Sequence, residues 1–353
     1  LRSLWLICDR RRRAANVAAV LFLLNPSTFA YAHYLWPETL HLFLLLLALN
    51  LLTRMPWHRA RAPLAGIALG LALLAKSLLS PFWPACALLF WHLRTWSQRL
   101  LAFALLAIGV LSVTGPLLWQ GWQATGKPLI ADSSAFNLVG GLEDRWRSDY
   151  VGDSVGDLYG PYIGGAPTAR ERNTLFLQRA RDDLAREGLV STLESQLSRQ
   201  YFRLFSAKTL LLSQLPGPAC SGYMGSYAQV PIGLDVLVTF SAVALHALTL
   251  AAFAFGIVLW RRWREPLVWW TLLFFAFQLA LYLPLHVKAR FLLPFMPFFC
   301  AYAGSFVASC INSERATAVE LRASALRWFV AAGLAALLLA LAFLGPVLDR
   351  SCG

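Results

Sequence analysis

The sequence predicts an all-α polytopic membrane protein with about nine transmembrane helices and one larger extracytoplasmic loop and helical domain. Three observations predict this fold class. The 353-residue chain is 58% hydrophobic and only 14% charged, a balance that excludes an ordinary soluble domain. Its apolar residues gather in runs long enough to cross a bilayer. A single polar stretch of about 110 residues interrupts these runs, and it is longer than a structureless connection in a compact domain.

Nine apolar segments are expected to cross the membrane. They lie near residues 15–33, 38–53, 62–78, 79–93, 100–119, 232–260, 266–285, 291–311 and 326–348. The third and fourth are short, so we expect them to tilt or to thin the bilayer locally. The spans divide the chain into an N-terminal membrane bundle of five spans (1–119), an extracytoplasmic loop and amphipathic-helix domain (120–231) and a C-terminal membrane bundle of four spans (232–353).

The orientation of the spans follows from the basic residues. With the N-terminal end in the cytoplasm, the inner connections hold 15 Lys and Arg residues. The short outer connections hold four, which are Lys76, Lys288, Arg290 and Arg350. Short loops rich in Lys and Arg stay in the cytoplasm. We therefore expect the N-terminal end to be cytoplasmic and the large loop to be extracytoplasmic.

The net charge of +13 is a topology signal. The long polar stretch holds 11 basic and 11 acidic residues, so its own net charge is zero. The positive excess therefore lies at the membrane ends, and nothing in the sequence indicates a nucleic-acid partner. The expected partner at these ends is the lipid bilayer.

The polar stretch divides into two parts. Residues 127–166 are rich in Gly, Asp, Ser and Tyr and are expected to form an irregular loop, which suits either sugar binding or plain solvation. Residues 167–211 are expected to be helical, since Thr168 followed by Glu171 is typical of a capping box. Gly188 should separate two helices, of which the second is amphipathic and fits the outer membrane surface.

The six cysteines form no CxxC pair, so neither a zinc site nor thioredoxin-type chemistry is indicated. Cys86, Cys300 and Cys310 fall in or beside spans, where cysteine acts as a small apolar packing residue. Cys220 and Cys352 fall outside the membrane in this topology, where a disulfide between them is compatible with the compartment.

Glu38 is the one carboxylate in the stretch "HYLWPETLHLF" and lies at the outer end of the second span. Two interpretations are open. Pro37 fits the first turn of a helix, and a carboxylate beside it interacts favourably with the positive helix N-terminus. Alternatively, Glu38 and the nearby His33 face a water-filled cavity, because ionisable residues at the edge of spans often mark functional sites.

The outer basic residues run against the positive-inside bias and so call for a reason. The stretch "LPLHVKARFLLPFMPFF" places His286, Lys288 and Arg290 in one short connection, and Lys76 ends the short third span. These side chains either snorkel to lipid headgroups or bind an anionic ligand, since Arg holds phosphate oxygens bidentately and Lys supplies a point charge.

Three stretches resemble the integral-membrane glycosyltransferases of the GT-C type, in the protein O-mannosyltransferase-like and aminoarabinose-transferase-like branches. "NPSTFAYAHYLWPETLHLFLLLLALNLL" is similar to the family's outer loop with an acidic residue between two spans. "LAGIALGLALLAKSLLSPFW" is similar to its Gly-rich span that ends in a basic residue. "KARFLLPFMPFFCAYAG" is similar to its late span, which an Arg enters and prolines break.

The resemblance implies transfer of a sugar from a polyprenyl-phosphate-linked donor to an acceptor lipid, glycan or protein on the extracytoplasmic face. It implies Glu38 as the catalytic carboxylate and Lys76, Lys288 and Arg290, with His286 and His33, as substrate-binding residues. No metal ligands are expected from the spacing of the acidic residues, but the family leaves a divalent cation open as cofactor.

One departure from the family concerns its principal acidic residue, which lies in the first outer loop after the first span. In this chain that span and loop would precede Leu1. Either the sequence is a piece of a longer protein, or this protein lacks the main catalytic carboxylate. The activity of this chain is therefore an open part of the expectation.

Two other functions are compatible with the same residues, namely a transporter or flippase of lipid-linked saccharide and a non-catalytic membrane scaffold. Transporters commonly show internal repeats, and none is found here. The only N-x-S/T triplet places Pro after Asn25 and is not an acceptor for N-glycans. We expect a multi-pass protein of the bacterial inner (plasma) membrane that acts in the cell envelope.

Overall fold

The computed structural model describes residues 12–25, 28, 37–54, 57–131, 133–143, 168–207, 232–285, 287–311 and 319–350. Throughout these residues the protein is helical, and no strand belongs to a sheet there. One isolated antiparallel bridge joins Trp260 and Val319. The predicted all-α fold class is confirmed.

The helices follow in the order α2 (Arg12–Leu24), α4 (Pro37–Thr53), α5 (Arg61–Ala75), η1 (Ser77–Leu79), η2 (Trp83–Phe90), α6 (Trp96–Thr125), α7 (Ser134–Leu142), α9 (Ala169–Glu187), α10 (Leu189–Arg199), η3 (Tyr201–Phe205), α11 (Ile232–Val258), α12 (Pro266–Tyr282), η5 (Ala289–Phe295), α13 (Met296–Ile311) and α14 (Ala325–Arg350). The segments with η labels are 3-10 helices.

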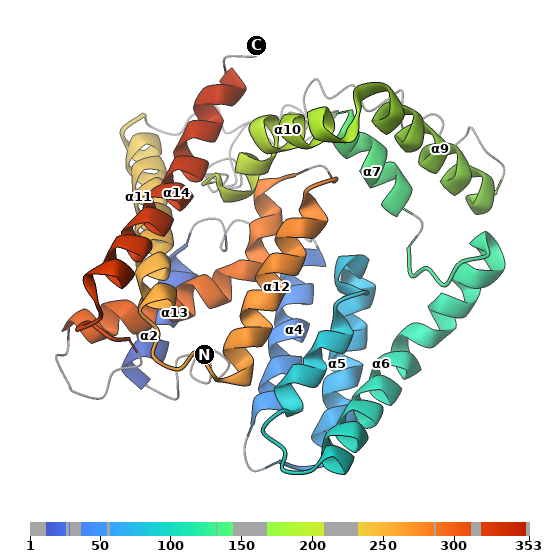
Figure 1. The fold of residues 1–353 in the computed structure, drawn as a ribbon, viewed down its shortest axis with the longest axis horizontal. Helices are drawn as coiled ribbons and strands as arrows, with labels where there is room; N and C mark the ends of the chain where they lie inside the picture. The colour runs from blue at the N-terminus through green and yellow to red at the C-terminus, as the bar shows by residue number, and fades with distance from the viewer. Residues whose placement is uncertain are drawn as a thin grey trace.

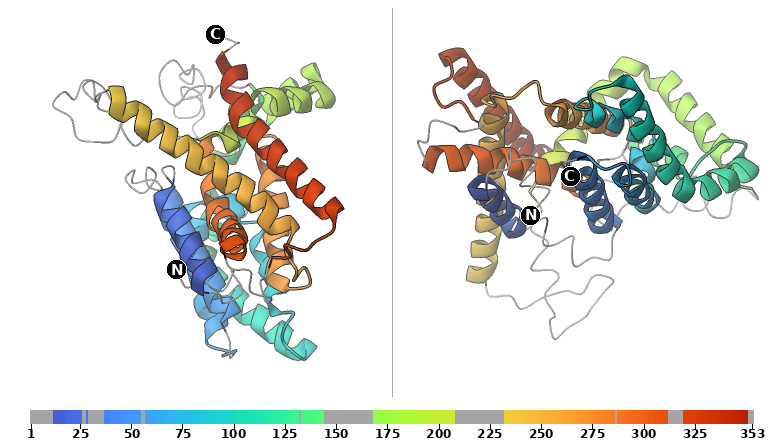
Figure 2. Two further views of the ribbon diagram at one scale, coloured as in Figure 1. Left: turned by 90° about the vertical axis from the view of Figure 1, so that its left-hand side faces the viewer. Right: turned by 90° about the horizontal axis from the view of Figure 1, so that it is seen from below.

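The apolar helices form two groups (Figure 1). Helices α2, α11, α13 and α14 lie together in one group, and α4, α5, α6 and α12 lie in the other. Helices α7, α9 and α10 lie across one end of the molecule, which we call the polar end. The second group and the crossing of α11 and α14 are also visible from the side and from below (Figure 2).

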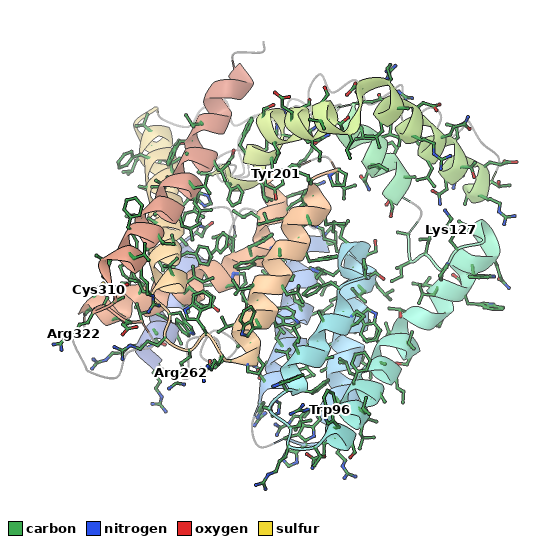
Figure 3. The ribbon with its side chains drawn as sticks, viewed as in Figure 1. Trp96, Lys127, Tyr201, Arg262, Cys310 and Arg322 are labelled. Carbon is green, nitrogen blue, oxygen red and sulfur yellow. The ribbon has the colours of Figure 1, made fainter. Side chains whose placement is uncertain are left out.

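The opposite end of the molecule carries the arginine-rich connections, and we call it the arginine end. Trp96 and Arg262 lie there, far from Tyr201 at the polar end (Figure 3). The chain alternates between the two ends as it passes through α4, α5 and α6. The basic connections therefore gather on one side, as the charge pattern of the sequence requires.

Within the described residues, four helices are long and apolar enough to cross a membrane. They are Trp96–Thr125, Val236–Val258, Ala289–Ile311 and Ala325–Leu344. Three further predicted spans coincide with the shorter apolar helices α4, α5 and α12. Large apolar side chains such as Ile108, Phe240 and Phe329 point outward from these helices. Such a surface fits a hydrocarbon solvent, and the protein is an all-α membrane protein.

The predicted span at 79–93 is wrong as an α-helix. The chain forms turns and the 3-10 helices η1 and η2 there instead. Pro81 and Pro84 explain the difference, because proline removes a backbone donor and clashes with the preceding turn of an α-helix. This segment still packs inside the apolar core, where Phe82 and Cys86 are buried.

Small residues allow the helices to approach closely. A Cβ on Gly66 of α5 would lie 2.2 Å from Leu106 O of α6, and one on Gly109 would lie 2.2 Å from Pro63 O. The same arrangement recurs between α11 and α13, where a Cβ on Gly256 would lie 2.2 Å from Tyr302 O. Glycine at these contacts is typical of membrane helix pairs, which gain their stability from close packing.

The two helices predicted within 167–211 are confirmed. Thr168 accepts a hydrogen bond from Glu171 N, and the Glu171 side chain accepts one from Thr168 N, which forms the capping box. Gly188, with φ of 79°, separates α9 from α10. Such a positive φ favours glycine.

The expectation of an irregular loop over 127–166 is wrong at residues 134–142, which form α7. Phe136 and Val139 of α7 are buried against Phe176 and Ala180 of α9, so tertiary packing stabilises a short helix. The rest of that segment from 144 lies outside the described residues, as do Cys220 and Cys352, so their disulfide stays a prediction. Cys86, Cys300 and Cys310 form no disulfide within the part of the chain that the structure describes.

Two hydrogen bonds fix the polar end to the apolar helices. The Tyr201 hydroxyl of η3 donates to Leu279 O of α12 at 2.9 Å. His246 Nε2 of α11 donates to Phe205 O at 2.9 Å, and this contact is buried. Segment η3 also packs against α14 and η5. These contacts hold η3, and α10 directly before it, against the apolar helices α11, α12 and α14.

Candidate functional site

Glu38, Lys76 and Arg290 come from three segments that meet toward the polar end. Glu38 lies in the first turn of α4, directly after Pro37. Helix α4 runs toward the arginine end and α5 returns beside it, so the residue after α5, Lys76, lies beside the start of α4. Arg290 enters through η5, which also packs against α4.

Two of the basic residues predicted for the site, Lys76 and Lys288, have an extended backbone at the end of a helix. Lys76 leaves α5 in an extended conformation, with φ of −151° and ψ of 103°. Lys288, which precedes η5, is also extended, with φ of −131° and ψ of 150°. Both segments therefore leave the regular helical pattern at a basic residue. The side chains that reach Glu38 from them are Lys76 and Arg290.

The carboxylate is shared between the two cations. Lys76 Nζ lies 3.5 Å from Glu38 Oε1, and Arg290 Nε lies 3.6 Å from the same oxygen. The Glu38 side chain is only 5% exposed and that of Lys76 only 11%, whereas that of Arg290 is 25% exposed. Arg290 is thus the member of this cluster that is most open to the surroundings. We call these three residues the Glu38 cluster.

The second oxygen of Glu38 is buried, and no described group lies within hydrogen-bond distance of it. A buried polar atom without a partner costs on the order of 1–3 kcal/mol. The two ion contacts are also longer than the ~2.7–2.9 Å of a tight charged hydrogen bond. The cluster is therefore loosely closed, with a carboxylate oxygen in a position to accept a donor.

Phe291 forms an aromatic support for the cations. Its ring centroid lies 4.5 Å from Lys76 Nζ and 5.4 Å from Arg290 Cζ. The ring also stacks on Tyr282 of α12, with centroids 5.1 Å apart and planes inclined by 10°. A cation over an aromatic face is attracted by the ring quadrupole. Phe291 thus holds both basic groups near Glu38 without neutralising them.

His41 and Tyr282 are polar neighbours that the sequence analysis did not single out. His41 lies one turn after Glu38 on α4, is fully buried and donates from Nδ1 to Ala72 O of α5 at 2.8 Å. Ala72 O also accepts from Lys76 N at 3.0 Å. The Tyr282 ring stacks on Phe291, the aromatic support of the two cations. The spacing of three residues between Glu38 and His41, which shares a helix face, was the available signal.

His41 links α4 and α5, the two helices that position Glu38 and Lys76. Its hydrogen bond joins α4, which holds Glu38, to the last turn of α5, which presents Lys76. Because the carbonyl can only accept, Nδ1 carries the proton, and the lone pair of a neutral ring lies on Nε2. His41 Nε2 and the Tyr282 hydroxyl are both buried with no hydrogen-bond partner among the described residues.

The other predicted site residues are placed as follows. Lys288 is buried and lies two residues before Arg290 in the same connection. His33 and His286 lie outside the described residues. The structure thus brings together Glu38, Lys76 and Arg290. The water-filled cavity expected around them stays a prediction.

The described residues contain no group of three or more His, Cys, Asp or Glu that could hold a metal ion. In the Glu38 cluster one carboxylate faces two cations. That arrangement repels a further cation and attracts an anion. The chemistry it can perform is to hold an anionic oxygen group at its basic side chains while a carboxylate oxygen accepts a hydrogen bond.

No protein-family model matches this chain, and neither a curated protein nor a solved structure matches it significantly.

Proposed function

We propose that this protein is a glycosyltransferase of the GT-C type that transfers a hexosyl or pentosyl group from a polyprenyl-phosphate donor to an acceptor on the extracytoplasmic face. One observation carries the proposal: a buried carboxylate and two cations from distant segments converge at one end of apolar helices. Ionisable side chains are expensive at such a place and mark functional sites there.

The cations suit the leaving group of the reaction. As the bond between the anomeric carbon and the phosphate oxygen breaks, negative charge develops on the departing polyprenyl phosphate. Fixed cations at that point stabilise the charge more in the transition state than in the ground state. Arg290 is the more exposed of the two and offers a planar donor fork, so it suits the phosphate oxygens directly. Lys76 adds a point charge behind it.

Glu38 suits the other half of the displacement. Its free oxygen can accept a hydrogen bond from the hydroxyl of the acceptor and orient that hydroxyl toward the anomeric carbon. The proton of the hydroxyl passes to this oxygen as the new bond between oxygen and carbon forms. Lys76 and Arg290 lie within ion-pair distance of the other oxygen of this carboxylate. Glu38 therefore orients the acceptor hydroxyl and accepts its proton, while Lys76 and Arg290 bind the departing phosphate.

The membrane placement belongs to the same proposal. Nine spans with a cytoplasmic N-terminal end would place the arginine end inside and the polar end outside, at the inner membrane of a bacterial cell. The outward apolar side chains of α6, α11 and α14 offer lipid-facing surface on which a polyprenyl chain can lie. The Glu38 cluster would then face donors carried in the outer leaflet.

The experiment uses the full chain reconstituted in phospholipid vesicles with radiolabelled polyprenyl-phosphate hexoses and pentoses. Release of free polyprenyl phosphate together with labelled acceptor supports transfer. Glu38→Gln should abolish that release, whereas Arg262→Gln, at an exposed pair with Glu265, should leave it unchanged. Movement of intact donor across the bilayer without release of polyprenyl phosphate would instead establish a transporter, and the proposal would be wrong.

A further inference from the structure

Helix α10 presents its polar side chains to the protein interior. Thr192, Gln196 and Gln200 recur every four residues and are all buried. Gln196 Nε2 and Gln200 Nε2 each donate to Gly141 O at 2.7 Å, at the end of α7. The two amides thus donate to a carbonyl in the last turn of α7, where carbonyls lack the i+4 donor of a continuing helix. The face of α10 that meets the protein is therefore made of hydrogen-bonding groups.

The neighbouring face of α10 is apolar and points away from the protein. Val190 is 79% exposed and Leu197 is 52% exposed. They are separated by seven residues, two helical turns, and so lie on one stripe. Leu193 lies between them and is partly buried. A helix surrounded by water hides its apolar stripe, and α10 does the reverse.

A third face of α10 is polar and exposed. Ser191, Glu194 and Ser198 lie on it. Three sectors therefore follow one another around the helix, one for the protein, one apolar and one polar. A helix in contact with protein, hydrocarbon and water at once requires this arrangement.

Helix α10 lies against a candidate membrane span. Helix α10 and segment η3 both pack against α14. Helix α14 holds one of the four candidate spans and exposes Leu337, Phe343 and Leu344. Helix α10 thus packs on a helix whose own exposed side chains are apolar over a candidate span. This neighbour favours lipid as the phase that covers the apolar stripe of α10.

We propose that α10 is an interfacial helix of the outer leaflet, with Val190 and Leu197 in the acyl region and Ser191 and Ser198 in water. The hydrogen bond from Tyr201 to Leu279 O fixes the level of η3, directly after α10, on α12. Leu279 lies one turn before Tyr282, whose ring stacks on Phe291 beside the Glu38 cluster. The cluster therefore lies at the bilayer surface. This proposal does not depend on sugar transfer.

The experiment places a nitroxide label at single cysteines in the full chain, with the native cysteines replaced, in phosphatidylethanolamine and phosphatidylglycerol vesicles. The variants form two matched pairs, Val190→Cys with Ser191→Cys and Leu197→Cys with Ser198→Cys. Collision with oxygen, which concentrates in lipid, is compared with collision with a water-soluble nickel chelate. The ratio of oxygen to nickel accessibility should be several-fold higher at Val190 and Leu197 than at their serine neighbours.

A third position supplies the reference for protein burial. A label at Gln196→Cys should be poorly accessible to both reagents if the helix keeps its packing on α7. Nickel accessibility at Val190 and Leu197 equal to that at the serines would place the whole outer face in water and overturn the proposal. Low accessibility to both reagents at Val190 and Leu197 would show that protein covers the stripe, which also overturns it.

Discussion

Two ion clusters at opposite ends of the apolar helices differ in how completely they are closed. At the arginine end, Arg327 donates to Glu320 Oε2 at 2.7 Å, to Val258 O at 2.7 Å and to Trp260 O at 3.0 Å. At the polar end, Lys76 and Arg290 share a single oxygen of Glu38 at 3.5 and 3.6 Å. The Glu38 cluster is the more buried of the two, and yet its ion contacts are the longer.

The comparison separates a structural ion pair from a candidate binding site. Arg327 donates a hydrogen bond to Val258 O at the C-terminal end of α11, where carbonyls have no intrahelical donor. Long ion contacts in a buried place repay little of the desolvation free energy of the charges. A protein that keeps them there gains something other than stability. We infer that the second oxygen of Glu38, which has no hydrogen-bond partner among the described residues, gains one when a ligand binds.

The largest expected effect concerns Glu38. Glu38→Gln keeps the shape of the side chain and removes its charge and its capacity to accept a proton. We expect transfer to fall by roughly 10²–10⁴-fold, the contribution of a positioned acid or base. Binding of polyprenyl phosphate should be retained or tightened, because the two cations lose their competing anion. Turnover equal to that of the wild type would show that Glu38 only begins its helix.

The second effect concerns Arg290. Arg290→Ala removes the exposed member of the Glu38 cluster, and we expect affinity for undecaprenyl phosphate to fall by about 10–100-fold, the equivalent of one charge-assisted hydrogen bond. Titration of the full chain in nanodiscs measures this. Arg290→Lys is the matched variant and should recover part of the loss, because it keeps the charge and loses the planar fork. Unchanged affinity in Arg290→Ala would remove the phosphate role.

The third effect tests the closed cluster. Arg327→Ala leaves the partly buried carbonyls of Val258 and Trp260, and the Glu320 carboxylate, without the Arg327 donors. We expect the free energy of unfolding to fall by about 2 kcal/mol, with affinity for undecaprenyl phosphate unchanged. Arg262→Ala is the control, since its exposed pair with Glu265 should contribute about 0–0.5 kcal/mol. Loss of ligand affinity in Arg327→Ala would contradict the separation of the two clusters.

The smallest effect concerns His41, which joins α4 to α5. The amide of Asn occupies nearly the position of Nδ1 and can still donate to Ala72 O, whereas the longer Gln places its amide nearer Nε2. His41→Asn should therefore keep most of the unfolding free energy, and His41→Gln should lose about 1 kcal/mol. Thermal unfolding in detergent compares the two. Equal loss in both variants would show that the hydrogen bond to Ala72 is unimportant.

Local signals in the sequence predicted much of the fold. The capping box at Thr168 and the break at Gly188 are set by neighbouring residues, and the structure confirms both. Contacts between distant residues were not predictable in this way. Helix α7 exists because Phe136 packs on Phe176. The segment at 79–93 differs, since its own Pro81 and Pro84 are local signals against an α-helix.

The Glu38 cluster was predictable only in part. Basic residues against the positive-inside bias identified Lys76 and Arg290 as candidates, and the helical hairpin of α4 and α5 explains why Lys76 meets Glu38. His41 and Phe291 were not predicted, because their roles depend on a carbonyl of another helix and on cations from two segments. A linear sequence shows neither relation.

The most direct measurement of the central claim is the thermal unfolding midpoint of the full chain with undecaprenyl phosphate and with undecaprenol, its uncharged counterpart. A ligand that binds the folded state raises the midpoint in proportion to its affinity. The Glu38 cluster as a phosphate site predicts a clear rise with the phosphate, little rise with the alcohol, and loss of the difference in Arg290→Ala but not in Arg327→Ala. Equal stabilisation by phosphate and alcohol in the wild type would contradict it.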